Sequence, residues 1–175
     1  MQIHSENTLS GSGVIVTITY NREKKLNTLN LEGIYELSRS FDVIVDDPTV
    51  RAVILAGSGH KAFVVGAAII ELSNLDTETA RTFIRSLHDL FTKIRNFPVP
   101  VIAEINGYAL GAGMELAAAC DLRIASNTAV FGMPEVQVGV PSVIEAALLP
   151  RLVGWGRANY LVLTGKNIDA RTAYD

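Results

Sequence analysis

Residues 108–116 read YALGAGMEL, which places two glycines and a carboxylate where an apolar segment runs into a helix. Gly111 and Gly113 lack side chains, so the backbone can bend there and another molecule can approach it closely. The Ala- and Leu-rich residues that follow favour a helix, whose first amides have no carbonyl partner within the helix. The stretch is therefore either a tight packing corner or a helix terminus that presents backbone donors together with Glu115.

The length of 175 residues predicts one compact domain covering residues 1–175, since domains commonly contain about 100–200 residues. Apolar runs are much shorter than the roughly 20 residues that cross a bilayer, and the polar N-terminus lacks the layout of a secretory signal. We therefore expect a cytoplasmic protein without a membrane partner. The single cysteine, Cys120, excludes an internal disulfide framework and is expected to be a small buried helix residue.

The net charge of −3 argues against the broad basic surface of a nucleic-acid-binding protein. Basic residues are nevertheless concentrated locally: Arg22, Lys24 and Lys25 follow the first expected strand, and Lys61 lies beside a glycine-containing loop. Isolated basic positions on an acidic protein favour a small anionic ligand. The alternative is that these are ordinary solvated loop residues.

Apolar side chains recur with the period of a strand in some segments and of a helix in others. Strands are expected at residues 13–20, 51–57, 99–107, 121–126 and 129–135, and helices at residues 31–45 and 80–94. Asn30 is a suitable N-cap for the first helix, and the prolines of residues 97–100 end the second. Strands and helices therefore alternate, which predicts an α/β fold with right-handed connections between parallel strands.

The end of the chain, TGKNIDARTAYD (164–175), predicts a turn, an N-cap at Asp169 and little more than one turn of helix. Helices that short are rarely stable alone. We therefore expect either that the chain is a fragment or that this end docks against another structure.

Three loops have compositions that core packing explains poorly: residues 61–69, the opening stretch, and residues 131–139. Gly66 follows a strand-like run in the first, and Glu135 follows a proline in the third. The common signatures of serine hydrolases, phosphate-binding loops, zinc proteases and dinucleotide-binding proteins are absent. The three histidines are scattered, with His88 expected at the boundary of its helix, so no metal site is predicted.

Four segments in order resemble the enoyl-CoA hydratase (crotonase) family: NREKKLNTLN (21–30), KAFVVGAAI (61–69), INGYALGAGMELAAACDLRIA (105–125) and FGMPEVQVG (131–139). The resemblance runs from about Val14 to the last residue. It implies an α/β fold of repeated ββα units wound into a spiral, followed by a helical C-terminal part that this chain would carry only in truncated form. It also implies homotrimers or dimers of trimers.

The resemblance assigns an oxyanion hole to the backbone amides of Ala67 and Ala112, where each donor can contribute roughly 3–4 kcal/mol in acyl chemistry. It makes Glu115 the base that activates water and Glu135 the acid that delivers a proton to C2. The positive end of a helix favours ionised Glu115, and an apolar pocket favours protonated Glu135. The expected activity is syn addition of water across the 2,3 double bond of an enoyl-CoA, without a metal or redox cofactor.

The coenzyme A part of that substrate would be contacted by Lys24, Lys25, Leu26, Lys61, Val65, Ala67, Ala68 and Ile69. The lysines are candidates for the phosphate and adenine end, with Leu26, Val65 and Ile69 near the ring. The family usually carries Ala-Gly-Ala-Asp at residues 65–68, so Ala68 stands where an aspartate is common, and Ala112 replaces a frequent glycine.

Glu145 has two interpretations. Residues 142–145, SVIE, match a capping box in which Ser142 and Glu145 satisfy the free donors of a helix start. Alternatively, Glu145 is a third acid near the substrate that influences substrate choice.

Other functions share parts of this pattern. Enoyl-CoA isomerases, dehydratases and hydrolases of the same superfamily use the same oxyanion hole, but many keep only one acid, so the presence of both Glu115 and Glu135 favours hydration. A non-catalytic acyl-CoA-binding subunit would bind without turnover. RNA binding is disfavoured because a basic, aromatic surface is absent.

Overall fold

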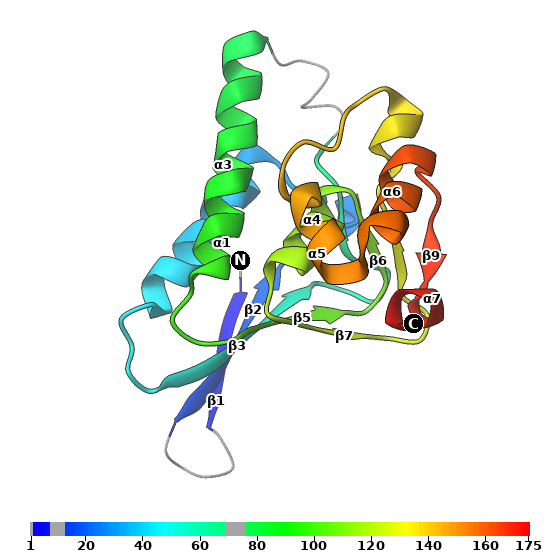
Figure 1. Cartoon of the computed structure of the whole chain (residues 1–175). Coiled ribbons are helices and arrows are strands. Elements are labelled where there is room, and N and C mark those ends of the chain that lie inside the picture. Colours follow the sequence, from blue (N-terminus) through cyan, green and yellow to red (C-terminus); the bar gives the residue numbers. More distant parts are fainter. Residues whose placement is uncertain (1, 8–12, 69–75) are drawn as a thin grey trace.

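The computed structural model describes residues 2–7, 13–68 and 76–175 and contains two β-sheets with helices packed around them (Figure 1). One sheet has the strand order β1-β2-β3-β5-β7 and the other the order β4-β6-β8-β9. The strands are β1 Gln2–Asn7, β2 Val14–Tyr20, β3 Val50–Gly57, β4 Ala62–Val65, β5 Val101–Ile105, β6 Tyr108–Leu110, β7 Leu122–Ala125, β8 Val130–Gly132 and β9 Ile168–Asp169.

The helices follow the strands in a repeating order. The α-helices are α1 Leu31–Ile44, α3 Thr77–Arg95, α4 Ala112–Ala119, α5 Leu149–Val153, α6 Trp155–Thr164 and α7 Ala170–Tyr174. The described residues also form the short 3-10 helices η1 Glu23–Lys25, η2 Pro134–Val138 and η3 Glu145–Leu148.

From β3 to β8, successive strands alternate between the two sheets. β3, β5 and β7 lie in the first sheet, whereas β4, β6 and β8 lie in the second, and neighbours within each series are parallel. The antiparallel pairs are β1 with β2 and β8 with β9. The pair β3-β4 precedes α3 and the pair β5-β6 precedes α4, which gives the spiral of ββα units and confirms the predicted α/β class.

The two predicted amphipathic helices are α1 and α3, which lie side by side (Figure 1). Asn30 caps α1 by accepting a hydrogen bond from the Gly33 amide at 3.1 Å, as predicted. The predicted stripe on α3 is buried or half-buried along its whole length, and the buried members are Phe83, Leu87, Leu90, Phe91 and Ile94. The buried residues of these two apolar faces belong to the same hydrophobic core as those of the strands and of α4.

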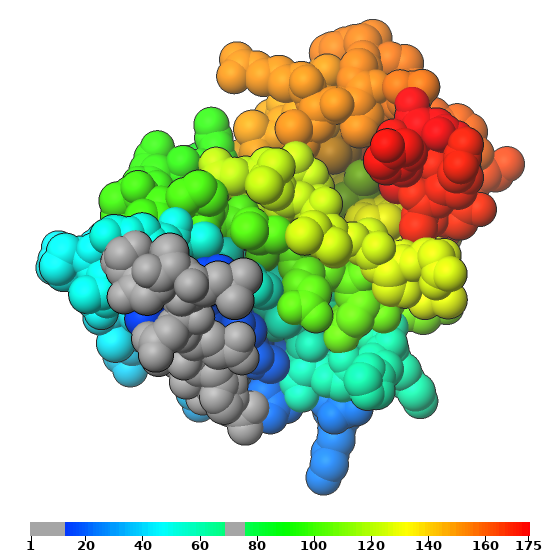
Figure 2. Space-filling view, turned by 90° about the horizontal axis from the view of Figure 1, so that it is seen from below, coloured from blue at the N-terminus to red at the C-terminus, as the bar shows by residue number. Residues whose placement is uncertain are grey.

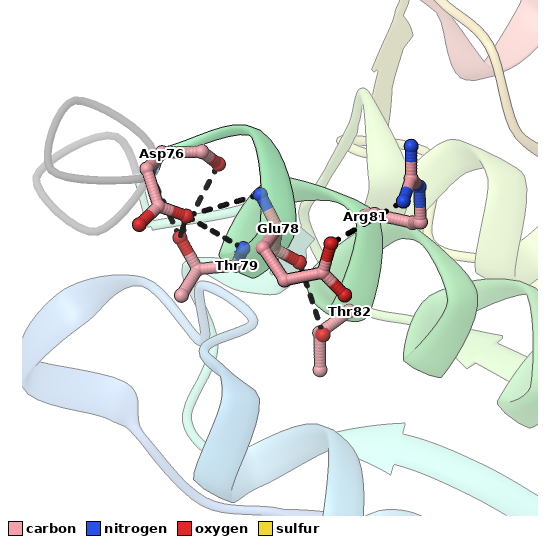
Figure 3. A network of polar contacts seen from close by, with 5 residues as sticks. All are labelled: Asp76, Glu78, Thr79, Arg81 and Thr82. Atoms are coloured by element: carbon pink, nitrogen blue, oxygen red, sulfur yellow. Dashed lines mark hydrogen bonds and ion pairs between the residues drawn. The ribbon is translucent and has the colours of Figure 1, made fainter.

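The start of α3 was not evident from the sequence. Asp76 caps the helix by accepting hydrogen bonds from the amides of Glu78 and Thr79 at 3.0 and 2.8 Å (Figure 3). The Thr79 hydroxyl accepts in turn from the Asp76 amide at 2.9 Å, so the first turn is satisfied reciprocally. α3 therefore begins before the apolar stripe does.

α4 is buried along its entire length. Gly113 is required by this packing, because a Cβ at that position would collide with the main-chain carbonyl of Val64 in β4. Cys120, just beyond the helix, is buried as predicted, and burial raises the pKa of its thiol to about 12. The small side chains of the segment thus serve close contact between α4 and the second sheet.

The segments from α5 onward gather on one side of the molecule, seen in orange and red in Figure 2. The predicted cap at Asp169 is confirmed, since its carboxylate accepts from the Thr172 amide at 2.8 Å. Among the residues that the structure describes, no helix combines the length and apolar character needed to cross a membrane.

Candidate active site

The parallel pairing of β4 with β6 brings two equivalent strand ends together. Val65 is paired with Leu110, and each is followed by a glycine with a positive φ, 61° at Gly66 and 54° at Gly111. Glycine adopts such torsions without the steric cost that a side chain would bring. A Cβ on Gly111 would lie 3.6 Å from the Cα of Gly66, so the two turns are in close proximity.

The amides of Ala67 and Ala112 follow directly after these turns. Leu29 bridges to the loop in parallel fashion, donating to the Gly66 carbonyl at 2.9 Å and accepting from the Ala68 amide at 2.8 Å. In this arrangement the N–H of the intervening Ala67 faces away from Leu29. Ala112 opens α4, where the first amides have no intrahelical acceptor, and within the described part of the chain neither amide donates to an identified acceptor.

Both alanines line one cavity of about 440 Å³ together with Glu115 and Glu135. Its remaining walls are mostly apolar and come from α3 and from the segment that includes η2: Phe83, Ile84, Leu87, Val138, Val143 and Ile144. Residues that carry two backbone amides without an identified acceptor and two carboxyl groups therefore line one apolar-walled space. Such a space can bind a carbonyl oxygen and exchange protons with the atoms beside it.

Glu115 lies in the first turn of α4 and is only 2% exposed. Its Oε1 accepts a hydrogen bond from the Ala146 amide at 2.8 Å. Burial raises the pKa of Glu115 to about 7; the Ala146 donor opposes this shift, and the nearby charges of Glu135 and Glu145 add to it. Burial thus outweighs the expected effect of the helix terminus, which would keep Glu115 ionised at lower pH.

Glu135 lies in the first turn of η2, after Pro134. A Cβ at Gly111 would collide with Oε1 of Glu135, so the glycine also makes room for this carboxyl beside the turn. Burial raises the pKa of Glu135, whereas a hydrogen bond of 3.3 Å from the Ser142 hydroxyl lowers it. Both carboxyl groups of the cavity therefore hold their protons to higher pH than free glutamate does.

Glu145 neither takes part in a capping box nor lines the cavity. Its Oε1 lies 3.0 Å from Nδ1 of His88 and its Oε2 lies 3.7 Å from Nη1 of Arg95, both on α3. The capping-box interpretation is wrong, because η3 has no side-chain cap and the Ser142 hydroxyl bonds to Glu135 instead. Glu145 is buried behind the cavity and does not line it.

The basic segment after β2 is held in an unusual conformation. Leu26 and Asn27 have φ of 51° and 54°, which non-glycine residues seldom adopt. The buried Asn27 amide stabilises the turn by donating to the carbonyls of Ser58 and Ala62, both at 2.9 Å. The Leu26 carbonyl accepts from the Val65 amide at 3.2 Å. These hydrogen bonds therefore hold the segment against β4, the strand that leads to the cavity.

The predicted coenzyme residues lie along this path. Lys24, Lys25, Leu26 and Lys61 are exposed, whereas Val65, Ala67 and Ala68 are half-buried. The backbone bond from Ala68 to Leu29 is formed without the aspartate that is common there. Ile69 lies outside the described residues.

Several residues of the site were missed by sequence reasoning. They are Asn27, which fixes the basic turn, Ser142, which contacts Glu135, and Ala146, whose amide contacts Glu115. Phe83 and Leu87 belong to the buried face of α3 and also line the cavity. Only Ser142 carried a local signal, and that signal was the misleading capping pattern.

A larger hollow of about 640 Å³ lies between α4 and the C-terminal helices, but neither glutamate of the site lines it. Within the described ranges, no three His, Cys, Asp or Glu side chains are grouped as metal ligands would be. The chemistry-bearing groups are therefore concentrated in the smaller cavity.

A sequence model of enoyl-CoA hydratase/isomerase matches residues 10–175. The chain belongs to the enoyl-CoA hydratase/isomerase family. It is 42% identical over 166 residues to the short-chain-enoyl-CoA hydratase of Clostridium acetobutylicum, covering 94% of this chain and 64% of the relative. It is also 42% identical over 161 residues to the crotonyl-CoA hydratase of Syntrophomonas wolfei, covering 91% of this chain and 62% of that protein.

Solved structures of this enoyl-CoA hydratase/isomerase family share the fold. The crystal structure of enoyl-CoA hydratase from Bacillus anthracis superposes with a TM-score of 0.90 at 36% identity, covering 99% of this chain and 66% of that one. The predicted crotonase fold is therefore confirmed. The chain spans a little under two thirds of the length of these relatives.

The raised pKa of Glu115 predicts a specific pH dependence of stability. The ordinary value is 4.5 and the folded value about 7, so the folded state binds this proton more tightly than the unfolded chain. The free energy of unfolding should fall as pH rises from about 4.5 to about 7, by about 3 kcal/mol for this group. Glu115→Gln removes this contribution, so in urea unfolding the free energy of unfolding of the variant should rise relative to that of the parent across that pH range. If the free energies of unfolding of the two proteins changed in parallel with pH, the result would contradict the burial of an ionisable Glu115.

Proposed function

We propose that this chain acts on acyl-CoA thioesters as an enoyl-CoA hydratase that adds water syn across the 2,3 double bond. The observation that carries the proposal is the single cavity shared by the amides of Ala67 and Ala112 and the carboxyl groups of Glu115 and Glu135. The names of the relatives, short-chain-enoyl-CoA hydratase and crotonyl-CoA hydratase, support the same activity.

The two amides act on the thioester carbonyl. Attack at C3 of the enoyl group moves negative charge onto the carbonyl oxygen, and donors that are already oriented stabilise this charge without reorganisation. Each donor of this kind can contribute about 3–4 kcal/mol to the transition state. Apolar walls strengthen the effect because they lower the local dielectric constant. Ala67 and Ala112 therefore supply the enolate stabilisation.

The two carboxyl groups accept and donate the protons of the reaction. Ionised Glu115 takes a proton from water as the oxygen adds to C3, and protonated Glu135 delivers a proton to C2. Burial raises the pKa of both carboxyl groups, to about 7 for Glu115, so each holds its proton to higher pH than free glutamate does. The net charge of the pair is unchanged by this step, but Glu115 now carries the proton and Glu135 is ionised, so a proton must pass from Glu115 to Glu135, directly or through solvent, before the next turnover. The assignment of base and acid follows the family resemblance.

The coenzyme would extend from the cavity along the basic turn. Lys24, Lys25 and Lys61 provide exposed positive charge for the phosphates. Leu26, 40% exposed although apolar, is held beside Val65 in a left-handed conformation. Strain of this kind is often retained where function needs a side chain in one place. We assign Leu26 to a contact with the adenine ring.

Assembly into trimers or pairs of trimers, and a cytoplasmic location, stay predictions of the resemblance and of the sequence. The acyl chain length also awaits a scan of substrates.

Replacing either acid should abolish hydration. Glu115→Gln and Glu135→Gln keep the size of the side chain but remove its proton exchange, so the rate should fall by about 10²–10⁴-fold while acyl-CoA binding is preserved. Absorbance of the conjugated enoyl thioester follows the reaction, and chromatography identifies the 3-hydroxyacyl product.

A matched control is Glu104→Gln, which changes an exposed carboxylate on β5 and should leave the rate unchanged. Full activity of either site variant would remove that residue from the mechanism. A product with a shifted double bond would indicate an isomerase, and binding without turnover would indicate a non-catalytic subunit.

The Leu26 assignment predicts opposite effects on stability and binding. Leu26→Gly removes a left-handed leucine that costs about 1–2 kcal/mol, so the thermal midpoint should stay the same or rise. The same change removes the proposed ring contact, so Kd for a CoA thioester should increase several-fold by calorimetry. Unchanged Kd would show that the side chain does not contact the coenzyme.

A further inference from the structure

We propose that His88 and Arg95 of α3 are positioning residues that act through Glu145: the three side chains anchor η3 against α3 and thereby hold the Ala146 amide on the carboxyl group of Glu115. The kinetic part of this inference rests on the proposed hydratase function, whereas its structural part does not.

The buried carboxylate of Glu145 is paired with two side chains of α3. Glu145 is 4% exposed, and a buried carboxylate is costly unless cations and hydrogen bonds compensate it. His88 and Arg95 are seven residues apart, so they lie on the same face of α3, two turns from each other. Each approaches a different oxygen of Glu145, at 3.0 and 3.7 Å respectively. The cluster therefore fixes both the position and the rotation of this carboxylate.

Glu145 is joined directly to the residue that contacts Glu115. Ala146, the next residue, donates its amide to Oε1 of Glu115 at 2.8 Å. Hydrogen bonds to a carboxylate of this length are strong and directional. The 3-10 turn that carries Ala146 has no side-chain cap of its own, so the Glu145 cluster is the polar anchor of this turn. A shift of the turn would move the donor away from Glu115.

The carboxyl groups of Glu115 and Glu145 each have titratable or charged neighbours. Glu115 faces Glu135 and Glu145, and Glu145 faces His88 and Arg95. Removing the α3 side chains would leave the Glu145 charge less compensated and the turn less anchored. Both changes favour the protonated form of Glu115, so they act in the same direction.

The test uses the whole chain with ¹³C-labelled glutamate side chains. NMR titration follows the Glu115 carboxyl, assigned by its loss in Glu115→Gln. We expect the double variant His88→Ala/Arg95→Ala to raise the half-titration pH of Glu115 by at least half a unit. Its hydration kcat should fall at least tenfold while KM changes less than twofold. Both replaced side chains are more than 40% exposed, which favours retention of the fold.

Two further variants separate positioning from a general structural effect. His88→Gln can still donate a hydrogen bond to Glu145, and alone it should leave the Glu115 titration close to the parent value, whereas His88→Ala should not. Arg81→Ala removes a cation of the same helix that pairs with exposed Glu78, and it should change nothing. An unshifted Glu115 titration in the double variant would overturn the proposal. A shifted titration in a chain without hydratase activity would support the positioning role while refuting the proposed function.

Discussion

The register between β4 and β6 is the constraint on which the site depends. Pairing Val65 with Leu110 sets the two strand ends level, and the glycine after each strand turns the chain into a conformation that a side chain would strain. The next residue on each side, Ala67 or Ala112, then lines the cavity. Gly113 completes the arrangement, because only a residue without a Cβ lets α4 approach β4 so closely.

Around this backbone frame the site holds carboxyl groups that water would otherwise solvate. Glu115 bonds to the Ala146 amide, Glu135 to Ser142, and Glu145 to α3. Burial without such partners would be costly, and burial still raises the pKa of Glu115 to about 7 and raises the pKa of Glu135. Perturbed carboxyl groups gathered in one cavity are typical of catalytic sites. The rigid core supports this arrangement, and η3 connects the most buried acid to α3.

Local patterns in the sequence predicted much of the fold. Alternation identified β2, helical periodicity identified the buried faces of α1 and α3, and Asn30 and Asp169 cap their helices as expected. The caps and the apolar faces depend on neighbours a few residues away, which the sequence displays directly. The two glycine turns and the two glutamates were instead singled out through the family resemblance; these residues line one cavity, and their roles stay predictions.

Long-range contacts were not predictable in the same way. The pattern of residues 142–145 suggests a cap, yet Glu145 pairs with His88, which is 57 residues away. The effect of the helix terminus on Glu115 is local, but the burial that outweighs it depends on packing against residues 144–146. The assignment of alternate strands to two sheets likewise follows from three-dimensional packing.

The most direct test of the central claim is a crystal structure of the chain with an unreactive acyl-CoA thioester. The account predicts that the thioester oxygen lies about 2.7–3.1 Å from the nitrogens of both Ala67 and Ala112, with Glu115 and Glu135 beside C2 and C3. A thioester oxygen bound by other groups, or an acyl chain lodged away from both glutamates, would contradict it.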